Sequence, residues 1–421
     1  MDNNNDIISN NGEGLIQPSE LMGADDDINE HENQEVGYSS YNAAVPDLDV
    51  SKFGIYYDGT HYYRPTPQGH WIKISEGSVK RVLKGKGLNN RKEEDQVISE
   101  IDHAINLIQD KLYIAYAGKL AGYKAGPTII LGNKILVTES LIVPVIKQGD
   151  WDILRQLIIG LLGEEQSTYF YSWIKVFLDS LIKQVRKDGQ MLAIAGPPEC
   201  GKSLLQRLIT IIFGGRMAKP YQYMSGRSDF NAELFSAEHL MIEDEVASID
   251  NSYRKNFGSQ IKQFAVSSEH KCHPKGKEGI TLTPYWRVTM SLNDEYDSLR
   301  TLPPNMDGVW DKIILLRGYR KDMPMPTYTS DDKKKFWDRL VNEIPAFLHH
   351  LIEEFEIPLD KRNPRFGIMS YHNPELFTDF QQQEPDNVLL GLIDDVLLTG
   401  KEVWTGGSNE LEKYLLNCLD T

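Results

Sequence analysis

The segment from Met191 to Phe213 constrains the fold more than any other part of the chain. A short apolar run, Met191–Ala195, is followed at once by Gly196-Pro-Pro-Glu-Cys-Gly-Lys-Ser203, and Leu204–Phe213 continues with helical spacing. Strand, G-x-x-x-x-G-K-S and helix, in this order, is the context that a phosphate-binding loop requires. Average composition produces the bare pattern in roughly one or two of a hundred chains this long. Its place between a strand and a helix makes coincidence rarer still.

Each residue type in this loop has a physical role. The glycines let backbone N–H groups turn inward around phosphate oxygens, at the positive end of the following helix. Lys202 would neutralise the β- and γ-phosphates, and Ser203 would bind Mg²⁺ through its hydroxyl group. The sequence therefore predicts ATP and Mg²⁺ as cofactors. The expected binding residues are Gly196, Pro197, Pro198, Glu199, Cys200, Gly201, Lys202, Ser203 and Leu204.

Two later strand-like runs end in side chains suited to the same chemistry. His239-Leu-Met-Ile is followed by Glu-Asp-Glu, and we assign Asp244 to the metal and Glu245 to the attacking water. The frame Glu243-Asp244 is the alternative, because a strand end predicted from sequence is uncertain by a residue or two. Taken alone, such an acidic end is more often a solvated turn.

A third run, Trp286–Asn293, ends in an amide that could hydrogen-bond the attacking water. The alternative for Asn293-Asp294 is a helix cap or a turn, since both residues suit either. A fourth run, Lys312–Leu316, completes the set. Short apolar runs that alternate with helices are typical of a mostly parallel α/β sheet.

A cationic segment lies between the second and third of these strands. Three lysines and two histidines flank a Pro and a Gly in Glu269-His-Lys-Cys-His-Pro-Lys-Gly-Lys277, which predicts a basic loop or hairpin. Such a tip on an ATPase module suits contact with a nucleic-acid backbone. A solvated loop is the alternative, because isolated charge runs usually are solvated. Zinc binding is disfavoured, because Cys272 and His273 are adjacent and no second ligand pair follows.

The charge of the chain is concentrated at one end. Of the net −16, residues 1–50 contribute −12, from twelve acidic and no basic side chains. The other residues hold 49 acidic and 45 basic groups, which excludes a uniformly basic nucleic-acid coat but not a local patch. We expect residues 1–50 to be disordered. Three cysteines, a polar N-terminus and no long apolar run predict a soluble, cytoplasmic protein.

The order of these features resembles the superfamily 3 helicases, which are AAA+ ATPases of DNA viruses and mobile elements. The match is nearer to the helicase half of poxvirus-like and phage or plasmid primase–helicase proteins. Beyond the phosphate loop, the acidic strand, Lys262, the basic hairpin and the Asn-ended strand, several short stretches are similar to that family. They are Gly214-Gly-Arg, Ser228-Asp-Phe-Asn, Ser291-Leu-Asn-Asp, Leu302-Pro-Pro, Asp311-Lys-Ile-Ile-Leu-Leu, Arg365-Phe-Gly and Trp404-Thr-Gly-Gly-Ser-Asn-Glu-Leu-Glu.

The resemblance implies an α/β fold: a P-loop NTPase, AAA+-like, with a three-layer α/β/α core. A small α+β domain would precede this core, and a helical region with a winged-helix-like end would follow it. The boundaries that we expect are a 1–50 acidic tail, a 51–145 N-terminal domain, a 146–187 helical collar, a 188–325 ATPase core and a 326–421 C-terminal region.

It also implies a ring, usually a hexamer, that hydrolyses ATP between subunits and moves DNA through its pore. The hairpin residues Lys271, His273, Lys275 and Lys277 would contact the DNA. The family usually places an Arg near the start of the last core strand to act on the neighbouring subunit. Here Lys312 holds that position, with Arg317 and Arg320 further on, and a lysine offers a point charge in place of a bidentate fork.

We therefore expect an ATP-dependent DNA helicase or translocase that replicates a viral or mobile element, with Lys202, Glu245, Asn293 and Lys312 as catalytic residues. The first 185 residues show no paired-carboxylate primase signature, so a primase would be a separate partner. One alternative is an AAA+ ATPase that remodels protein–DNA complexes without unwinding. Another is a nucleotide-gated DNA-binding assembly module, although the presence of both Glu245 and Asn293 favours turnover.

Overall fold

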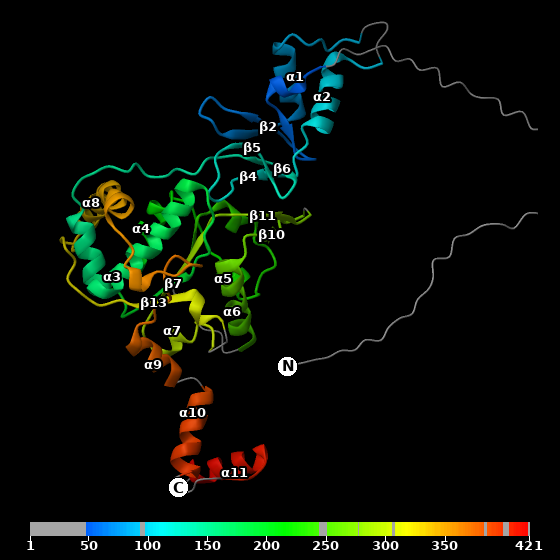
Figure 1. Ribbon diagram of the computed structural model, residues 1–421. Coiled ribbons are helices and arrows are strands. Elements are labelled where there is room, and N and C mark those ends of the chain that lie inside the picture. The colour runs from blue at the N-terminus through cyan, green and yellow to red at the C-terminus, as the bar shows by residue number, and fades with distance from the viewer. Residues whose placement is uncertain are drawn as a thin grey trace, which may run out of the picture. The chain divides into compact units, whose positions relative to one another are not determined.

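A five-stranded parallel sheet lies at the centre of the computed structural model (Figure 1). The structure describes residues 48–92, 97–243, 251–276, 278–304, 308–382, 385–398 and 404–419. The strand order is β13-β7-β12-β9-β8, and each neighbouring pair is parallel. The strands are β7 Met191–Ala195, β8 Met217–Ala218, β9 His239–Glu243, β12 Arg287–Leu292 and β13 Ile313–Arg317.

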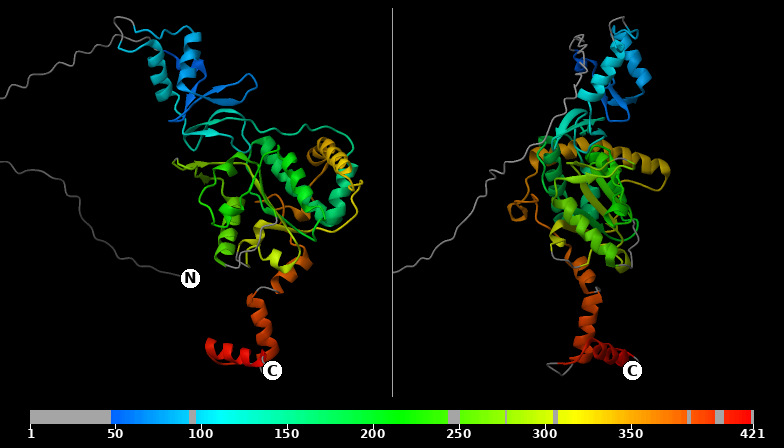
Figure 2. Two further views of the ribbon diagram at one scale, coloured as in Figure 1. Left: turned by 180° about the vertical axis from the view of Figure 1, so that it is seen from behind. Right: turned by 90° about the vertical axis from the view of Figure 1, so that its right-hand side faces the viewer.

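The sheet is buried on both faces, which explains its nearly continuous apolar strands. In β7, Leu192 and Ile194 pack in one hydrophobic cluster, whereas Met191, Ala193 and Ala195 pack in another. The first cluster contains side chains of α3 Asp152–Lys183, α4 Lys202–Ile212 and α8 Ser330–His349. The second contains side chains of α5 Tyr221–Met224 and α6 Asn251–Val266. Helices therefore cover both faces (Figure 1, and from behind in Figure 2), which confirms the predicted mixed α/β class.

The order of strands brings three predicted strand ends together. β12 lies between β7, which leads into the phosphate loop, and β9, which leads into the acidic residues. All four predicted strands are present: β7 has the predicted ends, and the ends of β12 and β13 differ from the predicted ones by one residue. β8 was not predicted, because its two residues are too few to show a period.

Two small sheets and a helix pair precede the central sheet. Strands β1 and β2 form a hairpin with Asp58-Gly59 in its turn, where the Asp58 Oδ1 atom accepts hydrogen bonds from the backbone N–H groups of Thr60 and His61. The first sheet contains β1 Tyr56–Tyr57, β2 Tyr62–Pro65 and β3 Trp71–Ile74, after the short helix η1 Val50–Phe53. The helices are α1 Glu76–Gly85 and α2 Glu100–Lys111. The second sheet has the order β4-β6-β5, with β4 Tyr116–Gly118, β5 Gly126–Ile130 and β6 Asn133–Val137.

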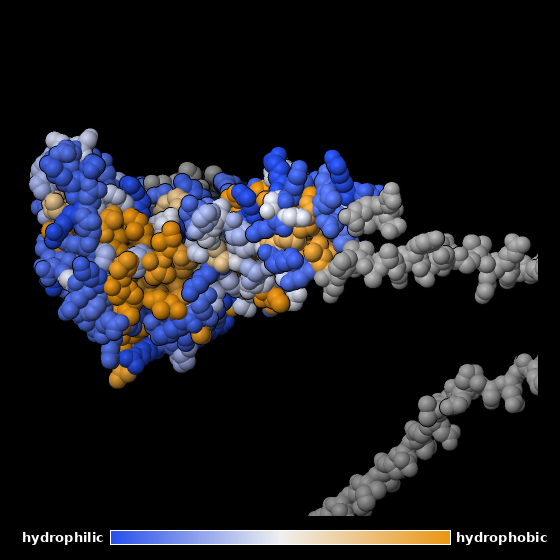
Figure 3. All heavy atoms as spheres, turned by 90° about the horizontal axis from the view of Figure 1, so that it is seen from above, coloured by the Kyte–Doolittle hydropathy of each residue, from blue (hydrophilic) through white to orange (hydrophobic). Residues whose placement is uncertain are grey.

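An extended segment, residues 138–151, links the second small sheet to α3. Its Lys147 N–H group donates to the Pro345 carbonyl oxygen in α8. Ile142 and Val145 of this segment are exposed. The segment crosses the top of the central domain in Figure 1, and the view from above in Figure 3 shows a group of hydrophobic residues on that face. Within the stretch 146–187, which was expected to be helical, the structure has one element, α3, which bends where Gly163 leaves the helical conformation at φ 74° and ψ 165°.

The C-terminal region is helical, as predicted, but the expected winged-helix-like end is not supported. A wing requires a β-hairpin, and residues 385–398 and 404–419 contain no strand. Pro385 begins a helix, where its missing N–H group costs no hydrogen bond. The elements are η4 His350–Glu354, η5 Leu359–Lys361, α9 Pro374–Gln382, α10 Pro385–Leu392, η6 Ile393–Leu397 and α11 Ser408–Leu419. Among the described helices, none is long and apolar enough to cross a bilayer.

Candidate functional site

The predicted phosphate loop connects β7 to α4 and is held at its start from two sides. The Gly196 N–H group donates to the Leu292 carbonyl oxygen (3.2 Å), and the Gly318 N–H group donates to the Ala195 carbonyl oxygen (2.7 Å). A Cβ atom at Gly196 would overlap the Gly318 carbonyl group, so only glycine fits this position. The close approach of these backbones fixes where the loop leaves the sheet.

Two residues of the loop have left-handed backbone conformations. Gly201, which precedes α4, has φ 111°, and Glu199 has φ 61°. Glycine adopts such angles without cost, whereas a residue with a side chain is strained by roughly 1–2 kcal/mol. The first helical turn of α4 exposes Ser203 at the mouth of the loop, where the sequence places its metal-binding hydroxyl group.

Lys202 lies inside the loop and meets the predicted amide. Its Nζ atom donates to the carbonyl oxygens of Gly196 (2.7 Å) and Pro197 (2.8 Å) and to the Asn293 Oδ1 atom (3.3 Å). The side chain is 6% exposed. Both residues were predicted from the sequence. They are 91 residues apart in the chain, and the strand order brings them into contact.

The predicted acids Asp244 and Glu245 lie outside the described residues, but Glu243, of the alternative frame, is described. It ends β9 and pairs in register with Ser291 of β12. Side chains alternate along a strand, so Glu243 shares a face with His239, whose Nδ1 atom is 2.7 Å from the Thr210 hydroxyl oxygen in α4. Glu243 therefore faces the side of the sheet that carries α4. The Ser291 hydroxyl group beside it is buried and has no hydrogen-bond partner among the described residues.

A buried polar network ties α4 to both neighbouring strands. The Gln206 Nε2 atom donates to the Thr289 hydroxyl oxygen (2.9 Å) in β12 and to the Ile242 carbonyl oxygen (3.1 Å) in β9. His239 Nε2 also lies 2.7 Å from the Thr289 hydroxyl oxygen. Burial lowers the pKa of His239 to about 3, so the imidazole stays neutral at physiological pH.

A pocket of about 450 Å³ adjoins the helix end of the loop. Three structural segments line it: the loop with α4, the stretch that follows β13, and the start of α8. The Arg207 guanidinium group stacks over the Trp337 ring at 4.6 Å. Sequence reasoning named only Gly201 and Leu204 here, since no pattern links α4 to α8. The lining residues are Gly201, Leu204, Arg207, Met323, Thr327, Lys333, Lys334, Phe336 and Trp337.

The three cations considered for action on a neighbouring subunit have different surroundings. Lys312 is buried, and its ammonium group lies 2.7 Å from the Asp311 carboxylate. Arg317 forms an ion pair with Glu375 in α9. Arg320 is exposed and donates to the Pro198 carbonyl oxygen of its own loop (2.7 Å). The expectation that Lys312 reaches a neighbour is therefore not supported, because burial and Asp311 hold it inside its own chain.

The predicted basic hairpin forms between β10 His270–Cys272 and β11 Ile280–Leu282, which pair antiparallel. Lys271 and Lys275 are exposed and His273 is half-buried, while Lys277 lies outside the described residues. Asn231, which sequence reasoning did not single out as a site residue, anchors the hairpin. Its side chain donates to the Lys271 carbonyl oxygen (2.9 Å) and accepts from the His273 N–H group (2.8 Å).

Comparisons with known proteins identify similar folds. Residues 194–305 match a family of unknown function, DUF5906. No curated protein matches the chain. Two apo structures of the NrS-1 C-terminal region are similar, with TM-scores of 0.54 and 0.53 and identities of 14% and 13%. These matches cover 86% and 87% of this chain, and 83% and 84% of those chains. At this identity the likeness shows the fold alone.

Proposed function

We propose that the chain is an ATP-dependent DNA helicase or translocase of the superfamily 3 type, which acts in replication of a viral or mobile element. The observation that carries the proposal is the meeting of three groups at one edge of the sheet. Lys202 in the loop after β7 contacts Asn293 after β12, and Glu243 ends β9 on the face toward α4. Ligands of open α/β sheets bind at the carboxyl ends of the strands.

The groups suit phosphoryl transfer from ATP to water. Lys202 and the loop N–H groups would stabilise phosphate charge, and Asn293 would position the attacking water. Ser203 and acids of the Glu243–Glu245 stretch would hold Mg²⁺, which would supply positive charge to offset the negative charge of the phosphate groups. Glu243, which belongs to the alternative frame Glu243-Asp244, lies on the face of the sheet that carries α4 and could take part in this chemistry.

The pocket beside the loop would hold the nucleoside. Its volume suits a small ligand. It begins at Gly201 and Leu204, so a base there would leave the phosphates on the loop. The Trp337 ring and the Arg207 guanidinium group offer flat surfaces for stacking.

The hairpin would contact the DNA backbone. Lys271 and Lys275 are exposed, and the Asn231 side chain fixes the strand that carries Lys271. Sequence-independent binding through lysines is electrostatic and therefore weakens with salt. A ring of subunits, which would place several hairpins around one DNA strand, would follow the superfamily 3 pattern, with any primase as a separate partner.

ATP hydrolysis by the purified chain, with and without single-stranded DNA, tests the proposal. We expect DNA to stimulate turnover, Lys202→Ala to abolish it, and Lys271→Ala to uncouple it from DNA. Lys73→Ala, which removes an exposed lysine of β3, is the control and should behave like the parent. A rate of ATP hydrolysis that is the same with and without DNA would favour the alternative function, an ATPase that remodels protein–DNA complexes without unwinding. Nucleotide binding without turnover would favour the assembly module.

A further inference from the structure

One polar side chain on the face of β12 toward α4 lacks a partner. Thr289, Ser291 and Asn293 stand at every second position of β12 and the residue after it, so they share this face. Thr289 accepts a hydrogen bond from Gln206 (2.9 Å), and Asn293 accepts one from Lys202 (3.3 Å). The Ser291 hydroxyl group, which lies between them along the strand, is fully buried and has no hydrogen-bond partner among the described residues.

A buried hydroxyl group without a partner lowers the stability of the folded chain, because folding removed its hydrogen bonds to water. Native proteins keep few such groups, and each one calls for a reason, such as a bound water molecule, an ion or a role in catalysis. Ser291→Ala would remove the cost and leave the packing nearly unchanged. The hydroxyl group therefore points to a partner that it gains when the site is occupied.

The carboxylate at the end of β9 is the acceptor that the strand pairing places beside this hydroxyl group. Glu243 pairs in register with Ser291, and paired residues of parallel strands point to the same face. The Glu243 side chain is 25% exposed, and its Oε2 atom lies 3.8 Å from the Nζ atom of Lys219, which is exposed. An ion pair of this kind holds a carboxylate weakly, so Glu243 can turn toward Ser291.

A second acceptor without a partner, the Gln206 Oε1 atom, is also buried near this face. The amide that carries it is already fixed, because its Nε2 atom donates to Thr289 and to the Ile242 carbonyl oxygen. A water molecule between Gln206 and Ser291 would give the hydroxyl group a role in the fold alone. The two acceptors therefore lead to different expectations for the same substitution.

We propose that Ser291 is a positioning residue, whose hydroxyl group donates to the Glu243 carboxylate and holds it in place when Mg²⁺ and nucleotide are bound. The inference rests on the proposed function, in which Ser203 and the acids at the end of β9 hold the metal. Ser291 acts through Glu243 and is not itself a ligand. The unpaired hydroxyl group costs stability in the ligand-free chain and gains a hydrogen bond in the loaded one, which favours the loaded state.

Binding of a fluorescent, non-hydrolysable triphosphate at increasing Mg²⁺ concentration tests this role without turnover. We expect Ser291→Ala to raise the Mg²⁺ concentration at half-saturation at least fivefold, and Ser291→Thr, which keeps a hydroxyl group, to raise it less. In a Glu243→Gln chain, adding Ser291→Ala should change this concentration less than twofold, because the carboxylate on which Ser291 acts is gone. An effect of equal size in both backgrounds, or none in the parent background, would overturn the assignment.

Urea unfolding without ligand separates this role from a role in the fold. Ser291→Ala should be at least as stable as the parent, because it removes an unpaired buried group. Ser172→Ala is the matched control: this equally buried hydroxyl group of α3 donates to the Thr168 carbonyl oxygen (2.7 Å), so its loss should lower the urea midpoint and leave the Mg²⁺ dependence unchanged.

A Ser291→Ala chain that loses as much stability as Ser172→Ala would show a partner within the fold, such as a water molecule at Gln206, and would overturn the assignment. Failure of the proposed function gives a different result, because the parent chain itself would then bind no nucleotide at any Mg²⁺ concentration.

Discussion

Glu199 shows how one residue of the phosphate loop departs from what its backbone conformation favours. Its φ of 61° lies in the left-handed region, and its side chain is exposed at the mouth of the loop. Side chains with a Cβ atom are strained there, most of all when they are β-branched. The carboxylate also adds negative charge where phosphate groups would bind.

Substitutions at Glu199 should therefore shift stability in opposite directions. We expect Glu199→Gly to raise the free energy of unfolding by up to about 1 kcal/mol, because the released strain exceeds the entropy that glycine loses on folding. Glu199→Val should lower it by about 1–2 kcal/mol. Urea unfolding of the three chains measures both changes. A valine chain as stable as the parent would contradict the conformation that we describe for the loop.

At the residue scale, sequence patterns named two residues that are in contact in the structure, but not the residues around them. Lys202 was predicted from the loop motif and Asn293 because it ends an apolar run, and the parallel pairing of β7 with β12 brings them together. Asn231 and Trp337 carry no such local signal. Their positions depend on how the hairpin and α8 pack, which no spacing within one element records.

At the scale of elements, β12 has a polar face within an apolar sheet. Thr289, Ser291 and Asn293 follow at every second position, and the first two are fully buried. Thr289 bonds to Gln206 of α4 and lies within hydrogen-bond distance of His239. The network thus joins the helix that begins with Lys202 to the strand that ends with Glu243.

The buried His239 should make stability depend on pH. In the unfolded chain an ordinary histidine takes up a proton below about pH 6.5, whereas in the folded chain His239 does so only near pH 3. The unfolded state therefore binds more protons between these values, and stability falls as the pH falls. From pH 7.5 to pH 5.5 the loss due to His239 should be about 1.4 kcal/mol.

Urea unfolding of the parent and of His239→Asn at both pH values isolates this contribution. The variant should be less stable at pH 7.5, because it loses hydrogen bonds of the network, but its stability should change less with pH. Other buried histidines, such as His270, titrate alike in both chains and cancel in the comparison. Equal pH dependence in the two chains would show that His239 is not held neutral.

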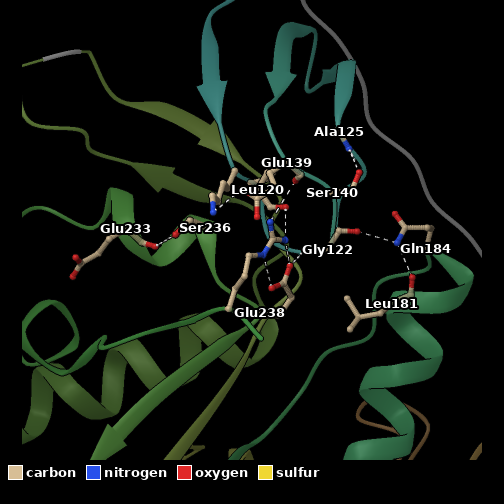
Figure 4. A network of polar contacts seen from close by, with 12 residues as sticks. Leu120, Gly122, Ala125, Glu139, Ser140, Leu181, Gln184, Glu233, Ser236 and Glu238 are labelled. Carbon is tan, nitrogen blue, oxygen red and sulfur yellow. Dashed lines mark hydrogen bonds and ion pairs between the residues drawn. The ribbon is translucent and has the colours of Figure 1, made fainter. Parts of the chain in front are cut away.

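At the scale of the whole molecule, one buried ion pair joins the second small sheet to the central sheet (Figure 4). Arg216, just before β8, pairs with Glu238, just before β9, and its Nε atom is 2.9 Å from the Glu238 Oε2 atom. Glu238 also accepts from the Gly122 N–H group (2.7 Å), and Gln184 after α3 donates to the Gly122 carbonyl oxygen (3.0 Å). Sequence patterns did not predict this junction, since its charges lie between the elements that carry periodicity.

Removing one partner of this pair should cost more than removing both charges. The Glu238 carboxylate has no exposed surface, so Arg216→Met would leave a buried charge unpaired at a cost of about 3–5 kcal/mol. Adding Glu238→Gln removes that charge, so the double variant should be more stable than Arg216→Met alone. Urea unfolding of both chains measures the difference.

Lys119→Met supplies the matched control for that comparison, because Lys119 pairs with Glu139 in the same region (2.7 Å), but these side chains are 45% and 42% exposed. Exposed pairs contribute less than about 1 kcal/mol. If Arg216→Met cost no more than Lys119→Met, the buried pair would not stabilise the junction. A double variant no more stable than Arg216→Met would show that the loss comes from packing of the arginine and not from the charge left on Glu238.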